Sequence, residues 1–298
     1  LEAIETGSDY HNHERHQMEI GVTMLPHFPK DTTDRNRTSP FAFTGNKFEF
    51  RMLGSTFSIA GPNIVLNTVV AESLCGFADR LEQAEDFSVE LSGLIKETIH
   101  KHKRIIFNGN NYSDEWLKEA ENRGLSNLKT TVDALSAFIR EDSIHLFAKH
   151  HVFAETEIRS RHEILLESYI KTLHIEALTM IEMVKKDIIP ACIAYQQELS
   201  QLICQKKECG EYDSSLEEQM LKKISQLSAS MLKNLTALEG SIDESTAECE
   251  INILASLYRD KIFSGMEKLR HVVDELETLV AKKHWPVPTY AEILYSVV

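Results

Sequence analysis

Apolar residues recur at helical spacing through most of the chain, from about residue 79 to residue 282. A stretch from about 154 to 186 keeps this spacing without a strong helix breaker, and a second stretch from about 244 to 282 repeats it. Because such residues lie on one face of a helix, each long helix needs a partner that buries that face. Long antiparallel helices joined by short links meet this need. The sequence therefore predicts a mainly α-helical fold that contains a long-helix bundle.

Cap and breaker residues predict where several of these helices begin and end. Ser113 and Ser126 each stand just before a helical pattern, where an N-cap hydroxyl can accept a backbone hydrogen bond. Pro190 is expected to join two separate helices, because proline lacks the N–H that a helix interior uses. Gly240 is expected to end a helix, and a separate one is expected to follow from about residue 244.

One stretch, residues 34–51, differs from the rest because it interleaves charged residues, aromatic residues and turn residues, as DRNRTSPFAFTGNKFEFR. Its last part alternates as a β-strand does, with successive side chains on opposite faces. The charged face would carry Lys47, Glu49 and Arg51. The other face would carry Phe48 and Phe50, which we expect to be anchored in a core. The stretch therefore predicts the short β portion of the fold.

A hairpin at this place would also bring cations together. The turn-forming residues 44–46, Thr-Gly-Asn, would fold the strand back on the residues before it. Because Arg35 and Arg37 lie in that upstream half, guanidinium groups would gather near the Glu49 carboxylate. Such a site suits anionic ligands and a hard metal ion. Periodicity alone also allows an edge hairpin whose outer face carries surface ion pairs.

The same residues carry a family resemblance. Asn36-Arg37-Thr38-Ser39 followed by Phe48-Glu49-Phe50-Arg51 resembles the late catalytic motifs of glutamine synthetases. The fuller form, DRNRTSPFAFTGNKFEFRM, resembles the type III enzymes in particular, and HWPVPTYAEILYSV near the end of the chain is similar to their C-terminal segment. A motif of this length is far more specific than a single pair of charged residues. The resemblance therefore favours an enzyme over a structural hairpin.

The resemblance implies a reaction and a role for each site residue. In that family, ATP phosphorylates the side-chain carboxylate of glutamate, and ammonia displaces the phosphate to give glutamine. By motif position, Glu49 would bind Mg²⁺ or Mn²⁺, and Arg51 would bind glutamate and the acyl phosphate formed from it. Arg37 would contact the γ-phosphate and the glutamate side chain. Arg35 and Lys47 would contact the nucleotide phosphates.

The resemblance also implies an organisation of the chain. Residues 1–85 would be the C-terminal part of the α+β catalytic domain, and residues 86–298 would be a helical C-terminal region that serves assembly. The family forms ring-shaped oligomers, so a homo-oligomer of stacked hexameric rings is expected. The N-terminal β-grasp domain, the other metal-binding glutamates and a substrate-binding histidine would lie upstream. We therefore expect the chain to be a fragment that is inactive alone.

The sequence departs from the better-known bacterial type at several points. Lys47 stands where that type has arginine, and a lysine loses the bidentate fork. The link between the two motifs is shorter, and Phe-Ala-Phe at 41–43 occupies the region of a further arginine. For the flap carboxylate that shields the intermediate, Glu19 and Asp31 are weak candidates.

Charge and cysteine content exclude some classes of function. A net charge of −14 argues against nucleic acid as the main partner, because binding phosphates requires basic patches. The basic run at 100–104, HKHKR, is expected to favour a helix C-terminus instead. The sequence has no run of about 18 apolar residues, so no membrane span is predicted. The 5 cysteines lack a tight metal-binding spacing and suggest reduced thiols in a cytoplasmic protein.

Other interpretations stay open at this point. A metal site could be drawn at His11, His13 and His16, although their neighbours suggest a polar loop. The carboxylates of residues 155–176 could be drawn as a di-metal bundle site, although a solvated helix face fits their spacing better. The chain could also be a non-catalytic helical assembly module, or part of a related ligase that joins glutamate to another amine.

Overall fold

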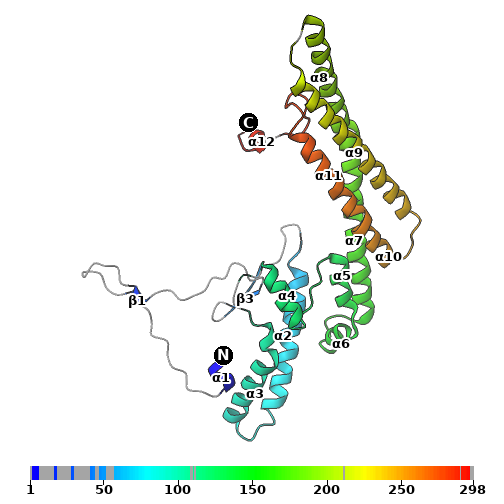
Figure 1. Ribbon diagram of the computed structural model, residues 1–298. Coiled ribbons are helices and arrows are strands. Elements are labelled where there is room, and N and C mark those ends of the chain that lie inside the picture. Colours follow the sequence, from blue (N-terminus) through cyan, green and yellow to red (C-terminus); the bar gives the residue numbers. More distant parts are fainter. Residues whose placement is uncertain are drawn as a thin grey trace. The chain divides into compact units, whose positions relative to one another are not determined.

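The computed structural model describes residues 2–6, 17–18, 28–29, 41–43, 47–51, 57–107, 110, 112–210, 212–288 and 290–295. Helices account for most of these residues, so the predicted mainly helical fold is confirmed (Figure 1). The chain forms two compact units, one of residues 1–128 and 145–154 and the other of residues 129–144 and 155–298. The division between residues 85 and 86 concerns the domains of the resembled family and stays a prediction.

The strands of the first unit form two short antiparallel pairs. Helix α1 (Glu2–Thr6) precedes the pair of β1 (Gln17–Met18) and β2 (Phe28–Pro29). The second pair joins β3 (Phe41–Phe43) to β4 (Phe48–Phe50). Its register sets Phe41 opposite Phe50, Ala42 opposite Glu49 and Phe43 opposite Phe48. The predicted pairing of the two halves is therefore confirmed, while the predicted turn at 44–46 lies outside the described residues.

The helices of the first unit are α2 (Ala60–Leu81), α3 (Phe87–His102), the 3₁₀ turn η1 (Lys103–Ile105) and α4 (Asp114–Asn122). Asp86 caps α3, and Arg80 at the end of α2 bonds to Glu90 and Glu97 of α3. An apolar groove of about 540 Å³ lies between these two helices. The basic residues at 100–102 occupy the last turn of α3, as predicted.

Of the two predicted helix starts, one is right and one is wrong. The Ser113 hydroxyl accepts a hydrogen bond from the Trp116 amide at 3.3 Å, so this serine caps α4. The next helix, α5 (Thr131–Ser136), begins after Thr130 and not at Ser126. Thr130 accepts from the Asp133 amide at 3.2 Å and donates to the Asp133 carboxylate at 2.6 Å. This reciprocal pairing fixes the helix start four residues later than predicted.

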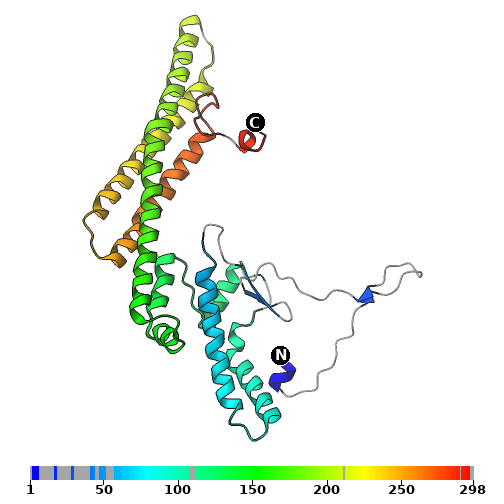
Figure 2. The same ribbon diagram turned by 180° about the vertical axis from the view of Figure 1, so that it is seen from behind.

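The second unit contains the long helices. It begins with α5 and the 3₁₀ turn η2 (Ala137–Ile139). Helix α6 (Glu141–Lys149) is divided between the two units. Next come α7 (Glu155–Met183), η3 (Val184–Ile188) and α8 (Ile189–Cys209). The chain then forms α9 (Ser215–Ser245), α10 (Ile251–Leu257), η4 (Tyr258–Phe263), α11 (Ser264–Glu277) and α12 (Tyr290–Tyr295). Helix α9 packs against both α8 and α11 (Figure 2).

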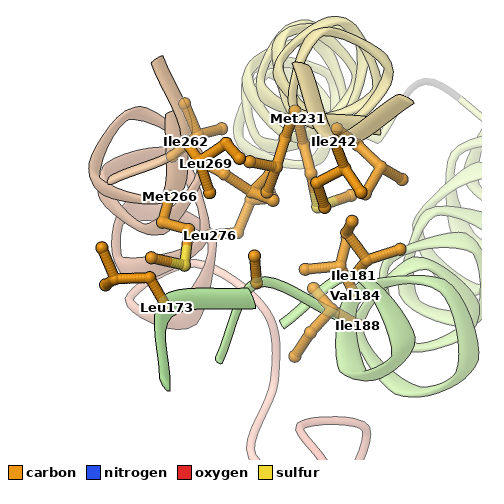
Figure 3. Packing of buried hydrophobic residues seen from close by; sticks show 14 of the residues in the cluster. Leu173, Ile181, Val184, Ile188, Met231, Ile242, Ile262, Met266, Leu269 and Leu276 are labelled. Carbon is orange, nitrogen blue, oxygen red and sulfur yellow. The ribbon is translucent and has the colours of Figure 1, made fainter. Parts of the chain in front are cut away.

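The core of this unit is a single apolar cluster. Leu173, Ile181 and Val184 from the α7 side lie opposite Met231 of α9 and Leu269 of α11 (Figure 3). Each helix contributes one stripe and keeps its charged residues outside, which is the pattern that the periodicity predicts. The carboxylates that could be drawn as a di-metal site, including Glu163 and Glu167 of α7, are exposed.

The predicted join at Pro190 is wrong, because the helix does not stop there. Residues 155–209 run as one continuous helix in which η3 is a π-helical segment just before the proline. The Ile189 amide bonds to the Val184 carbonyl, five residues back. This wider turn makes room for the proline ring, which would clash with a carbonyl in a regular α-helical turn. Val184 and Ile188 stay buried through it.

The predicted helix end at Gly240 is also wrong. Helix α9 continues to Ser245, with Leu238 and Ile242 buried on either side of the glycine. Burial of this face outweighs the low helix propensity of one glycine. The following helix begins only after Glu250, whose carboxylate accepts from the amides of Asn252 and Ile253. This following helix runs through α10, the π-helical segment η4 and α11, and it ends at Glu277.

Candidate active-site hairpin

The strand β4 places two predicted site residues in direct contact. Glu49 and Arg51 are two positions apart, so their side chains leave the same face of the strand. The Arg51 guanidinium donates to Glu49 Oε2 from Nη2 at 2.7 Å and from Nε at 3.2 Å. The Glu49 side chain is 41% exposed and the Arg51 side chain is 27% exposed. The hairpin therefore presents an ion pair at its surface.

Lys47 completes the charged face of this strand. It stands two positions before Glu49, as Arg51 stands two positions after it, and its side chain is exposed. Three charges of alternating sign thus follow one another along one edge. Such a row can bind an anion through its cations and a cation through its carboxylate.

The opposite face of the hairpin differs from the prediction. Phe48 and Phe50 were expected in a core, but they are 59% and 42% exposed. The register pairs them with Phe43 and Phe41 of β3. Two strands cannot bury their own face, because burial needs further strands or a covering helix. The aromatic alternation thus predicts the strand correctly but not its burial in this chain.

The other predicted site residues lie outside the residues that the structure describes. These are Arg35 and Arg37, with the weak flap candidates Glu19 and Asp31. The histidine cluster at 11–16 also falls there. Of the five site residues, the structure therefore brings together Glu49 and Arg51 and sets Lys47 directly before β4.

Glu49 has the chemistry of a ligand for a hard divalent cation. Mg²⁺ commonly takes one or two carboxylate oxygens and completes its shell with water and substrate phosphates. A half-exposed carboxylate on the rim of a hairpin fits that mode of binding. In the described part of the chain, no group of three histidine, cysteine, aspartate or glutamate residues could hold a metal ion. Glu49 can therefore supply one ligand of a shared site.

Helix α2, which follows the hairpin, is held from a distant part of the sequence. Glu72 accepts from Lys149 Nζ at 2.7 Å, and His150 Nε2 lies 2.7 Å from its other carboxylate oxygen. The hydrogen bond from Lys149, with a smaller effect of His150, holds the pKa of Glu72 below its ordinary value of 4.5. This Glu72 clamp ties residues 145–154 to helix α2.

Sequence reasoning missed two of these features. The contact between Glu49 and Arg51 was detectable, because opposite charges two positions apart on a strand share a face. The Glu72 clamp was not, because its partners are 77 and 78 residues away in the sequence. Long-range pairs of this kind have no local signature.

The chain matches the family model described as the glutamine synthetase C-terminal domain over residues 90–207. It is 40% identical to a glutamine synthetase of Butyrivibrio fibrisolvens over 99% of this chain and 42% of that protein. It is 37% identical to a type-3 glutamine synthetase of Dictyostelium discoideum, over 93% of this chain and 39% of that protein.

A glutamine synthetase of Bacteroides fragilis is 30% identical over 98% of this chain and 41% of its own length. The chain thus spans roughly two fifths of the length of the curated relatives it matches. Within the described residues, no helix has both the length and the apolarity needed to cross a membrane. The hairpin motif, the family-model match and these relatives agree: residues 90–207 match the C-terminal domain of glutamine synthetases, and nearly the whole chain is similar to these enzymes.

Proposed function

We propose that the whole protein is a glutamine synthetase, which uses ATP to join ammonia to glutamate through a γ-glutamyl phosphate intermediate. The observation that carries this proposal is the charged face of β4. It sets a carboxylate and a guanidinium side by side within a chain that is 30–40% identical to three glutamine synthetases over nearly all its length. Those relatives extend beyond this chain, so the remaining site residues would come from the rest of the protein.

The residues of this chain would divide the work by charge. Glu49 would hold Mg²⁺ or Mn²⁺, which when bound neutralises the phosphates of ATP. Arg51 would orient the glutamate carboxylate and stabilise the acyl phosphate through its planar fork. Lys47 and Arg35 would bind nucleotide phosphates as positive charges, and Arg37 would contact the γ-phosphate.

The helical region would serve assembly and not chemistry. Its long helices carry exposed apolar residues, such as Ile164 and Ile175 on α7, that a neighbouring subunit can cover. The family resemblance suggests stacked hexameric rings, and the 5 cysteines, which are free, suit the reducing cytoplasm. Size-exclusion chromatography with light scattering of the whole protein would test the ring assembly.

The reaction is tested with the purified whole protein, supplied with ATP, glutamate, Mg²⁺ and ammonia. We expect glutamine and ADP to form in equal amounts, and product to disappear when any one component is omitted. Replacing ammonia by a polyamine distinguishes the related amine ligases. A protein that consumes ATP only with the polyamine would contradict the proposed substrate. One with no ligase activity toward any amine would support the assembly-module alternative.

A further inference from the structure

The contact between Glu49 and Arg51 has a consequence for ligand binding. In the proposed function, the carboxylate takes a divalent cation and the guanidinium takes an anionic substrate. In the structure, these two groups are bonded to each other, with Nε and Nη2 of Arg51 both donating to Glu49 Oε2. A carboxylate oxygen has two lone pairs, and two N–H donors use both of them. The ion pair and the ligands therefore compete for the same atoms.

We propose that a divalent cation and Arg51 compete for Glu49, so that binding of the cation releases the guanidinium for the anionic substrate. This inference rests on the proposed function, in which Glu49 is the metal ligand. A cation on Oε2 has to displace the two N–H donors. A cation on the other oxygen would face a guanidinium only a few ångströms away, because both charges sit on one carboxylate.

The exposure of the pair is what makes it exchangeable. The side chains are 41% and 27% exposed, so water can replace each partner as the contact opens. An exposed ion pair is worth about 0.2–1 kcal/mol, whereas removal of one partner from a buried pair is far more costly. Competition should therefore weaken cation binding by about 1.4- to fivefold, which is the same free energy expressed as a ratio.

The coupling runs in both directions. If the cation releases Arg51, an anion that binds Arg51 must in turn raise the affinity of Glu49 for the cation by the same factor. Metal and glutamate would then assist each other's binding through one shared ion pair. Arg51 would thus affect metal binding as well as bind the substrate.

The test is a titration of the whole protein with Mn²⁺ alone, in which free Mn²⁺ is followed by electron paramagnetic resonance. Glu49→Gln identifies the Glu49-dependent site by its loss. Arg51→Gln should tighten that site by about 1.4- to fivefold, because the competing donors are gone. Lys47→Gln is the matched control, since it removes one positive charge at the same sequence distance from Glu49. It should change the Mn²⁺ affinity by less than Arg51→Gln does, because its charge is not bonded to Oε2 in the same two-donor contact.

Two results would overturn the competition. The first is an unchanged or weaker affinity in Arg51→Gln, and the second is an equal gain in Lys47→Gln, which would reflect net charge alone. If Glu49→Gln leaves Mn²⁺ binding unaltered, the metal role of Glu49 is itself wrong, and this outcome separates the two proposals. Should Arg51→Gln fail to fold, Arg51→Lys serves in its place. Its ammonium lacks the planar fork that grips Oε2 through two nitrogen atoms, so the Mn²⁺ affinity of this variant should exceed that of the native protein.

Discussion

Gly240 offers a direct test of why α9 continues past its predicted end. The glycine lies within the helix, and an added Cβ would meet no atom of the described residues within 4 Å. Replacing glycine by alanine at such a site gains about 0.4–1 kcal/mol, mainly because the unfolded chain loses freedom. Gly240→Ala should therefore slow local opening of α9 by about two- to fivefold.

Gly265 of α11 is the matched control for that substitution. There an added Cβ would lie 3.2 Å from Leu238 Cδ1, on a leucine that is only 1% exposed. The gain in helix propensity is then opposed by overpacking, which typically costs about 1–3 kcal/mol. Gly265→Ala should leave opening unchanged or make it faster.

The measurement for both variants is hydrogen–deuterium exchange of the native whole protein, read from peptides that cover α9 and α11. Exchange of α9 amides should slow in Gly240→Ala and not in Gly265→Ala. If Gly240→Ala instead speeds exchange, the glycine is needed for its conformation and the burial argument is wrong. If both variants slow exchange alike, the close approach of Leu238 has no energetic effect.

Three further predictions concern the first unit. In the whole protein, Glu49→Gln should raise the Mg²⁺ concentration needed for activity. Arg51→Lys should raise the glutamate requirement by about ten- to a hundredfold without raising the Mg²⁺ requirement; equal increases in both titrations would show that the two roles are not separate. The Glu72 clamp should be fully present above pH 4.5 and should weaken as the pH falls through the lowered pKa of Glu72. Hydrogen–deuterium exchange of residues 145–154 should therefore accelerate in acid, and Glu72→Gln should abolish that pH dependence. Arg123 donates to Glu119 at 2.7 Å and to the Ile106 carbonyl at 3.0 Å. Arg123→Lys loses the planar fork and should lower the stability of α4 by about 1–2 kcal/mol, measured by hydrogen–deuterium exchange of its amides. Unchanged exchange of α4 would mean that the guanidinium contributes only its charge.

The sequence predicts the helices well because their signal is local. A repeat of apolar residues can be recognised without knowing what the helix packs against, as α7 illustrates by beginning at Glu155, one residue from the predicted start. The same holds for Ser113, whose capping bond spans only three residues. The β3–β4 hairpin was predictable for a similar reason, since its turn residues and alternation are adjacent.

The errors arise where distant packing decides. Pro190 and Gly240 are locally unfavourable in a helix, but the buried residues on both sides of each keep the helix continuous. Burial of Phe48 and Phe50 depends on whether another layer covers the hairpin, which alternation cannot reveal. For the site, the charges of Glu49 and Arg51 were predictable, and their mutual contact follows only once the strand is established.

The continuous helix through α7, η3 and α8 acts as a lever. Residues 155–209 form it without a break, and at about 1.5 Å per residue it extends roughly 80 Å. A rotation of about 5° at one end would move the other by about 7 Å, given that length. The C-terminal end of this continuous helix leads to the connection between α8 and α9, where Tyr212 and Leu216 are exposed. Small angular changes at the start of α7 would thus be magnified into displacements large enough to make or break a contact at the connection between α8 and α9.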